Sequence, residues 1–306
     1  MAIVFRCPTC RNLCAFEAKY AGRGARCTKC RQRFIIPSEN NAPAEKVREE
    51  PGVPISGFYR SVFIDSRKVL SGRENIVIAV FIIAVVTFKF FLGHFNFSFL
   101  VPGFAVNIPI DWITIIICWG CLFWFYMAVV ESAALGADEL PDIEMGEGLA
   151  WIATIIKSIY LFIVALILAE LPFMAAGAIL RENFGIDCPW LRHALVLAGF
   201  FFFPMVLLTI SSADQLWLVF RPDYIVVPIC RAFRPYLVCT GLVGVAVLMQ
   251  LMTVEYGALE DARWWLVAGH LLFDILAVIV AVLAMRSVGL FYRHYSCYFG
   301  WKRSAL

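Results

Sequence analysis

The sequence predicts a polytopic membrane protein with an all-α membrane domain, preceded by a small cysteine-rich head. Of its 306 residues, 61% are hydrophobic and 16% are charged, whereas soluble proteins average roughly 45–50% apolar and about 25% charged residues. Apolar windows long enough to cross a bilayer core of about 30 Å recur between residues 74 and 286. This composition excludes a soluble enzyme, and it makes the lipid bilayer the first expected partner.

The head, residues 1–36, contains two CxxC pairs in the pattern C-x2-C-x16-C-x2-C. This spacing is typical of a four-thiolate zinc site, because each CxxC turn aims two sulfurs at one point. We therefore predict zinc as the cofactor, with iron in a similar site and metal-free cysteines as alternatives. Cys14 stays outside the ligand set, as an apolar filler or a surface thiol. The predicted ligands are Cys7, Cys10, Cys27 and Cys30.

The same residues resemble a known family. FRCPTC, the turn from Gly22 to Gly24, RCTKC and the closing FIIP are similar to the short finger-like zinc-ribbon module found at the N-termini of many bacterial proteins. The resemblance implies two cysteine knuckles joined by a turn and closed by a final strand. The expected fold class is then an all-α polytopic membrane protein of about six transmembrane helices with a small N-terminal β zinc ribbon. The predicted apolar support is Phe5, Phe16, Phe34 and Ile35.

The head is strongly basic, with eight Lys and Arg residues against Glu17 alone. A positive surface attracts acidic protein, anionic lipid or nucleic acid. Since no aromatic stacking platform or recognition helix accompanies the charge, we expect a protein partner and not nucleic acid. Paired CxxC motifs also favour a reducing cytosol over a secreted disulfide framework.

The remainder of the chain divides into four segments. Residues 37–56, with four prolines, predict a flexible linker, and residues 57–73 predict an interfacial helix with Phe58, Val62 and Val69 on its apolar face. The transmembrane domain covers residues 74–286 and is followed by a cytoplasmic C-terminal tail, 287–306. The predicted spans are 75–92, 108–130, 149–180, 191–212, 236–256 and 264–286, with a kink near Pro172 in the third, and 213–235 predicts an amphipathic surface segment.

Charge bias predicts the topology. With the N-terminus inside, the inner segments hold eleven basic residues and the outer loops hold only Arg181, Arg192 and Arg263. Short cytoplasmic loops collect Lys and Arg. We therefore expect a multi-pass protein of the cytoplasmic (inner) membrane with both termini in the cytosol.

Ionisable residues within the spans indicate a possible polar site. His270 and Asp274 share one face of the last span, and Glu170 lies beside Pro172. Such residues could line a proton or cation path, or they could fix helix packing, which the absence of repeats favours. Lys89 and Lys157 lie nearer span ends and are expected to snorkel. Cys118 and Cys121 repeat the CxxC spacing inside a span, where apolar packing is favoured over redox chemistry.

The membrane half resembles uncharacterised six-span bacterial families in which an acidic loop such as ADELPDIEMGEGL, residues 137–149, leads into the third span. This resemblance implies a fold and no activity. The sequence contains no phosphate loop, nucleophile elbow or zinc-protease helix, so we expect no enzyme. The leading hypothesis is a membrane protein whose cytosolic zinc ribbon docks a partner or senses a cytosolic state. The alternatives are a transporter or channel component with Glu170, His270 and Asp274 near the pathway, and a membrane subunit or assembly factor of a larger complex.

Overall fold

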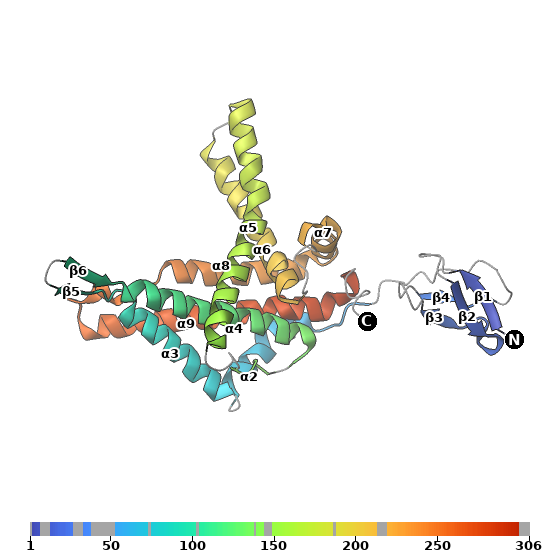
Figure 1. Ribbon diagram of the computed structural model, residues 1–306, viewed down its shortest axis with the longest axis horizontal. Helices are drawn as coiled ribbons and strands as arrows, with labels where there is room; N and C mark the ends of the chain where they lie inside the picture. The colour runs from blue at the N-terminus through green and yellow to red at the C-terminus, as the bar shows by residue number, and fades with distance from the viewer. Residues whose placement is uncertain are drawn as a thin grey trace. The chain divides into compact units, whose positions relative to one another are not determined.

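The computed structural model describes residues 2–6, 13–26, 33–37, 53–72, 75–101, 104–137, 139–143, 149–185, 188–212 and 219–299. The chain divides into two compact units. One is Met1–Val53 with Gly300–Leu306, and the other is Pro54–Phe299. The first contains short strands and the second contains the long apolar helices (Figure 1).

The N-terminal unit is built from two antiparallel β-hairpins. In the first, β1 pairs with β2 from Ala2 opposite Glu17 to Arg6 opposite Leu13. In the second, β3 pairs with β4 from Gly24 opposite Ile35 to Arg26 opposite Arg33. The strands are β1 (Ala2–Arg6), β2 (Leu13–Glu17), β3 (Gly24–Arg26) and β4 (Arg33–Ile35), with a 3-10 turn, η1 (Ala18–Tyr20), after β2.

The chain turns between the hairpins at Gly22, whose φ of 76° lies in the left-handed region that glycine adopts without steric cost. Its amide donates to the Ile36 carbonyl at 2.9 Å, and the Ile36 amide donates to the Arg23 carbonyl at 3.0 Å. These two bonds continue the pairing of the second hairpin beyond β4. The predicted turn at Gly22 to Gly24 therefore joins the two hairpins.

Side chains from both hairpins form one small core. Phe5 and Phe34 are fully buried with ring centroids 5.1 Å apart, and Phe16 packs against them. These three residues confirm the predicted apolar support. Ile36 is also buried, two residues after Phe34, as the alternation of side chains along an extended chain requires. The side chain of Ile35, the fourth predicted member, lies outside the described residues.

The second unit contains nine α-helices among its described residues. A π-helical segment, Ser61–Asp65, joins the first two, and a hairpin of strands β5 (Phe97–Val101) and β6 (Phe104–Ile108) follows the third. The helices are α1 (Phe58–Arg60), α2 (Ser66–Ser71), α3 (Ile76–Leu92), α4 (Ile110–Leu135), α5 (Ala150–Phe184), α6 (Pro189–Ser212), α7 (Pro222–Arg231), α8 (Phe233–Leu251) and α9 (Trp264–Tyr295).

Five of these helices, α4, α5, α6, α8 and α9, are long and apolar enough to cross a membrane. The chain is therefore a membrane protein. The sixth predicted span corresponds to α3, an apolar helix of 17 residues. At about 1.5 Å per residue, a helix of this length reaches just short of a hydrocarbon core of roughly 30 Å. The prediction of six crossings is thus supported for five helices and not confirmed for α3.

Helix α9 packs against α3, α4 and α8. Its contact with α4 is close at Gly289, where an added Cβ would lie 2.3 Å from the Val130 carbonyl oxygen and 2.7 Å from the Ala133 Cβ. Helices α5 and α6 form an antiparallel hairpin that crosses α4 and projects away from the group around α9 (Figure 1). Glycine at position 120 allows the α4–α5 crossing, because a Cβ there would lie 2.3 Å from the Ile155 side chain.

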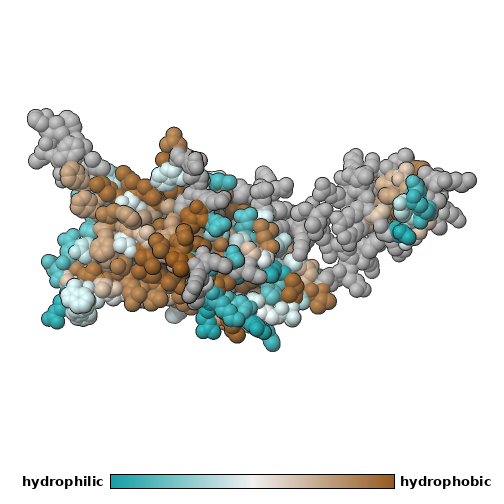
Figure 2. All heavy atoms as spheres, turned by 90° about the horizontal axis from the view of Figure 1, so that it is seen from below, coloured by the Kyte–Doolittle hydropathy of each residue, from teal (hydrophilic) through white to brown (hydrophobic). Residues whose placement is uncertain are grey.

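The helical unit presents a broad apolar surface, which appears brown over the face drawn in Figure 2. Helix α5 contributes strongly: only 22% of its most apolar window is buried, the smallest share among the span-length helices. Exposed side chains such as Ile156, Leu171 and Met174 lie along it. This is the surface expected of helices that contact lipid, since a bilayer solvates apolar side chains.

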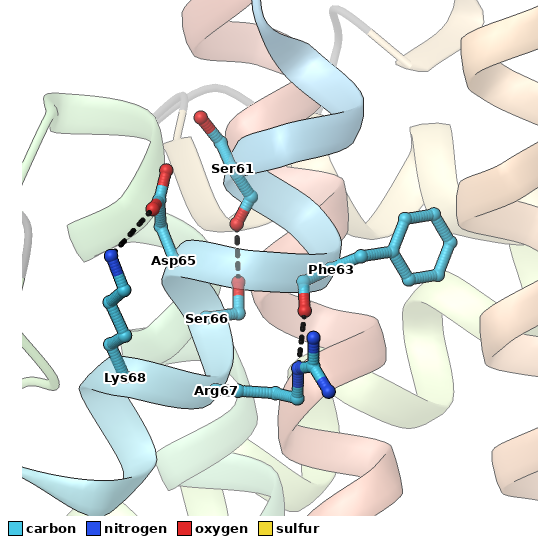
Figure 3. A network of polar contacts seen from close by, with 6 residues as sticks. All are labelled: Ser61, Phe63, Asp65, Ser66, Arg67 and Lys68. Carbon is cyan, nitrogen blue, oxygen red and sulfur yellow. Dashed lines mark hydrogen bonds and ion pairs between the residues drawn. The ribbon is translucent and has the colours of Figure 1, made fainter.

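The predicted interfacial segment is helical from Phe58 to Ser71 and contains the π turn (Figure 3). The Ser66 hydroxyl donates to the Ser61 carbonyl at 2.9 Å, and Arg67 Nε donates to the Phe63 carbonyl at 2.7 Å. Lys68 Nζ lies 3.9 Å from Asp65 Oδ1. The two hydrogen bonds supply partners to carbonyls in the wider turn, and the ion pair joins two side chains of the same segment.

The last predicted span is too short, because α9 continues past 286 to Tyr295, so the first part of the predicted tail is helical. The predicted loop 93–107 contains most of the β5–β6 hairpin, which no alternation signal predicted. The third predicted span, 149–180, corresponds to the single helix α5, with Pro172 inside it. Within 213–235, the described part is mainly α7.

The linker predicted at 37–56 lies largely outside the described residues, but its end belongs to the helical unit. The Ile55 amide donates to the His294 carbonyl at 2.9 Å, and His294 Nδ1 lies 2.9 Å from the Ile55 carbonyl oxygen. The phenyl ring of Phe58 packs on the His294 ring with centroids 5.8 Å apart. The end of α9 therefore anchors the chain before it enters α1.

Candidate functional site

The predicted metal ligands fall in the two hairpin connections of the N-terminal unit. Strand β1 ends at Arg6 and β2 begins at Leu13, so Cys7 and Cys10 belong to the connection between them. Likewise β3 ends at Arg26 and β4 begins at Arg33, with Cys27 and Cys30 between. The four cysteines themselves lie outside the described residues. Among the residues that are described, no cluster of three or more His, Cys, Asp or Glu side chains could hold a metal.

The two hairpin connections place their cysteines at the same sequence positions relative to the flanking strands. In each hairpin the first cysteine directly follows the last paired residue of the leading strand, Arg6 or Arg26, and the returning strand begins at the same offset. A tetrahedral four-thiolate site needs two such CxxC segments close together. If the four cysteines meet, this donor set would suit Zn²⁺ in a structural and not a catalytic role, because a four-thiolate site leaves no open position on the metal.

Cys14 lies on β2 opposite Phe5 and is 7% exposed, within the small core of the unit. A thiol in this environment acts as a small apolar side chain. Of the two roles predicted for Cys14, apolar filler and surface thiol, the structure shows the first.

One exposed surface of the N-terminal unit combines an aromatic ring with cations. Tyr20 is 38% exposed, Lys19 Nζ lies 4.9 Å from its ring centroid, and the guanidinium carbon of Arg23 lies 6.0 Å from it. Lys19 also forms an ion pair with Glu17. Cations held over an exposed ring make a surface suited to protein contact.

A buried ion pair joins two helices of the membrane unit. Lys89 Nζ on α3 lies 3.1 Å from Asp274 Oδ1 on α9. The two residues are only 8% and 2% exposed. Burying isolated charges in an apolar interior is costly, so each of these groups depends on the other. The prediction that Lys89 snorkels to the interface is therefore wrong, because its ammonium group has a partner inside the protein.

Helix α4 completes the surroundings of the ion pair. Lys89 Nζ lies 5.0 Å from the ring centroid of Trp119, in cation–π geometry. Tyr126 is 3% exposed, and its hydroxyl has no hydrogen-bond partner among the described residues. Three helices thus contribute to one polar site: α3 the cation, α9 the carboxylate and α4 the aromatic residues.

The other two predicted polar residues lie elsewhere. His270 is half-buried and faces a shallow apolar depression with Met252 and Trp265. Glu170 on α5 lies against α6, where a Cβ added to Gly199 would be 2.3 Å from Glu170 Oε2. Within the described residues, no hydrogen bond or ion pair joins Glu170 or His270 to Asp274. The predicted three-residue cluster is not formed.

Cys118 and Cys121 are buried, at 5% and 8% exposed, and are free thiols one turn apart on α4. Their burial inside the helical unit agrees with the expected packing role.

Comparisons with known proteins found no relative of this chain. No protein-family model, no curated protein and no solved structure matches this chain.

Proposed function

We propose that the protein is a non-enzymatic integral membrane protein whose N-terminal unit is a cytosolic zinc ribbon that docks a protein partner or senses a cytosolic state. The observation that carries the proposal is the position of the two CxxC motifs, each in the connection of a β-hairpin directly after the leading strand. Cys7, Cys10, Cys27 and Cys30 would hold the metal.

The size of the core supports a metal-dependent head. Among the described residues of the unit, five form its buried apolar cluster, two of them large aromatic side chains. A unit this small gains little free energy from burial, so zinc binding would supply much of its folding free energy. A docking role is supported by the exposed Tyr20 and by the basic residues beside it, which favour an acidic protein segment.

Metal analysis of the full-length protein tests the metal centre. We expect one zinc per chain in the wild type, and its loss in the double variant Cys10→Ser/Cys30→Ser. Cys14→Ser is the matched control, because it changes a thiol of the same unit outside the proposed ligand set and should retain the metal. Wild-type protein without zinc, or a double variant that keeps it, would refute the assignment.

The docking role needs its own test. A partner that co-purifies stoichiometrically from mild detergent should be lost in Tyr20→Ala/Arg23→Glu while the zinc content stays at one per chain. A partner retained by this variant and by the cysteine double variant would place the contact elsewhere on the protein.

We also propose that both termini lie in the cytosol and that the protein resides in the cytoplasmic (inner) membrane. The test depends on α3. If α3 crosses together with the five longer helices, the termini lie on one side, whereas five crossings alone would put them on opposite sides. Reporter fusions at Leu306 and within 93–107 distinguish these arrangements, and a cytosolic reporter in that loop would refute the proposed topology.

The buried ion pair favours a second candidate, a transporter or channel component with Asp274 in the pathway. Ionisable residues inside membrane domains often mark ion paths. Reconstituted vesicles with a pH-sensitive dye would report proton flux, which Asp274→Asn should abolish if this candidate holds. Unchanged proton flux in Asp274→Asn, or no flux in the wild type, would contradict this candidate. The Lys89–Asp274 pair would then serve only in helix packing.

A further inference from the structure

A pocket lies between the last turns of α5 and the first turns of α6, at the end of the projecting hairpin. It encloses about 360 Å³. Its walls are mostly apolar, with Phe173 and Met174 on α5 and Leu195 and Val196 on α6. The helices approach closely beside it, because a Cβ added to Gly177 would lie 3.1 Å from the Leu195 side chain.

Two arginines line the same pocket, Arg181 from the last turn of α5 and Arg192 from the first turn of α6. Neither has a carboxylate partner among the described residues. Of the two acids nearby in the sequence, Glu182 does not line the pocket and Asp187 lies outside the described residues. They are also two of the three basic residues that the predicted topology leaves in the outer loops. Arg181 and Arg192 therefore give the pocket a positively charged rim next to its apolar wall.

The exposed residues around the pocket favour a position at the headgroup region of a bilayer. Trp190, in the first turn of α6, is 85% exposed, and Phe184 at the end of α5 is 68% exposed. Exposed aromatic residues gather where the hydrocarbon core meets water. Toward the middle of the hairpin the exposed residues are apolar, including Met174 and Val196 at 65% and 49% exposed. A ligand in this pocket would therefore have its anionic part beside the arginines and its apolar part along the helices.

We propose that this pocket binds an anionic phospholipid, with the phosphate held by Arg181 and Arg192 and an acyl chain against the apolar wall. Guanidinium groups bind phosphate oxygens in two-pronged hydrogen bonds, which an uncharged or fully apolar occupant cannot use. An apolar helix from a second copy would fit the wall but would leave both arginines without anions. The charge on the rim therefore selects lipid over a protein helix.

Native mass spectrometry of the full-length protein in mild detergent tests the proposal with phosphatidylglycerol and phosphatidylcholine as probes. We expect wild-type protein to bind phosphatidylglycerol at least tenfold more tightly. Arg181→Gln/Arg192→Gln should weaken that binding roughly 30-fold, since each arginine near an anionic headgroup contributes about a fivefold gain. Arg263→Gln is the matched control, because it removes an outer arginine that does not line the pocket.

A second variant keeps the proposal testable if the arginine variant folds poorly. Val196→Trp fills the pocket and leaves both arginines, and it should also weaken phosphatidylglycerol binding. Equal affinity for the two lipids, or wild-type affinity in both variants, would overturn the proposal. So would glycerol 3-phosphate binding as tightly as the lipid, which would indicate a soluble phosphate ligand, or loss of a dimer in Val196→Trp with unchanged lipid binding.

Discussion

Replacing Lys89 with methionine removes the cation from the buried pair while keeping an unbranched side chain of similar length. Asp274, at 2% exposed, then has no counterion. At the observed separation of 3.1 Å, a pair in a medium of effective dielectric constant near 20 attracts by about 5 kcal/mol. Breaking a buried pair by removing one partner costs about 3–5 kcal/mol. We therefore expect Lys89→Met and Asp274→Leu each to lower the free energy of unfolding by about 3–5 kcal/mol.

The double variant Lys89→Met/Asp274→Leu should be more stable than either single variant, because it leaves no unpaired charge. The three free energies of unfolding, measured by denaturant titration in mixed micelles, give the coupling energy of the pair. Lys157→Met is the matched control, because Lys157 is an exposed lysine on α5 and should have little effect. Single variants as stable as the wild type, or a double variant that equals the sum of the single losses, would refute the ion pair as a stabilising contact.

Three further changes test packing elsewhere. Gly289→Ala should destabilise the helical unit by about 1–3 kcal/mol in a thermal unfolding assay, because the new Cβ would lie 2.3 Å from a carbonyl oxygen of α4. Gly269→Ala should be neutral in that assay, because nothing lies within 4 Å of the new Cβ. Phe34→Ala should unfold the N-terminal unit, because a buried aromatic side chain contributes about 3–5 kcal/mol. Limited proteolysis should then cleave the N-terminal unit faster in the Phe34→Ala variant than in the Tyr20→Ala variant. Tyr236→Phe should cost about 1 kcal/mol by removing the hydrogen bond to a carbonyl of α6, measured as a lower midpoint of unfolding in detergent.

The sequence predicted the parts of the fold that depend on local pattern. Apolar windows gave the positions of α4, α5, α6, α8 and α9, since a span needs only a run of apolar residues of sufficient length. The CxxC spacing and the aromatic residues of the head predicted a small paired unit with Phe5 and Phe34 inside. Ile36, which is also buried, was not predicted, because a strand that ends in consecutive isoleucines gives no signal for its alternation.

The candidate polar site could not be predicted in the same way. Asp274 was expected to share its site with His270, because residues four apart lie on one helix face. The structure pairs it with Lys89 on a helix far away in the sequence. Hydropathy places a lysine near a span end, and snorkelling is then the simplest expectation. Only the packing of α3 against α9 shows that the ammonium group has a buried partner. This partner can therefore be identified from the tertiary structure and not from the local sequence.

Helix α5 continues through Pro172, in agreement with the single span predicted at 149–180. Proline removes one backbone hydrogen bond and usually bends or ends a helix. Within a membrane, an interrupted helix would leave further amides and carbonyls without partners, and this cost favours continuation. The β5–β6 hairpin was not predicted, because its short strands give no clear alternation of apolar and polar residues, so the segment 93–107 was read only as a loop between two spans.

The ion pair also constrains how the protein can be made. Lys89 on α3 is synthesised well before Asp274 on α9, because 185 positions of sequence separate them. At synthesis rates of about 5–20 residues per second, roughly 10–40 s separate their emergence. Until α9 is made, Lys89 lacks its counterion, and an unpaired lysine at the centre of a span costs about 2.5–3.5 kcal/mol. We therefore expect truncation before α9 to weaken the insertion of α3, which a glycosylation or protease-protection assay on α3 would report.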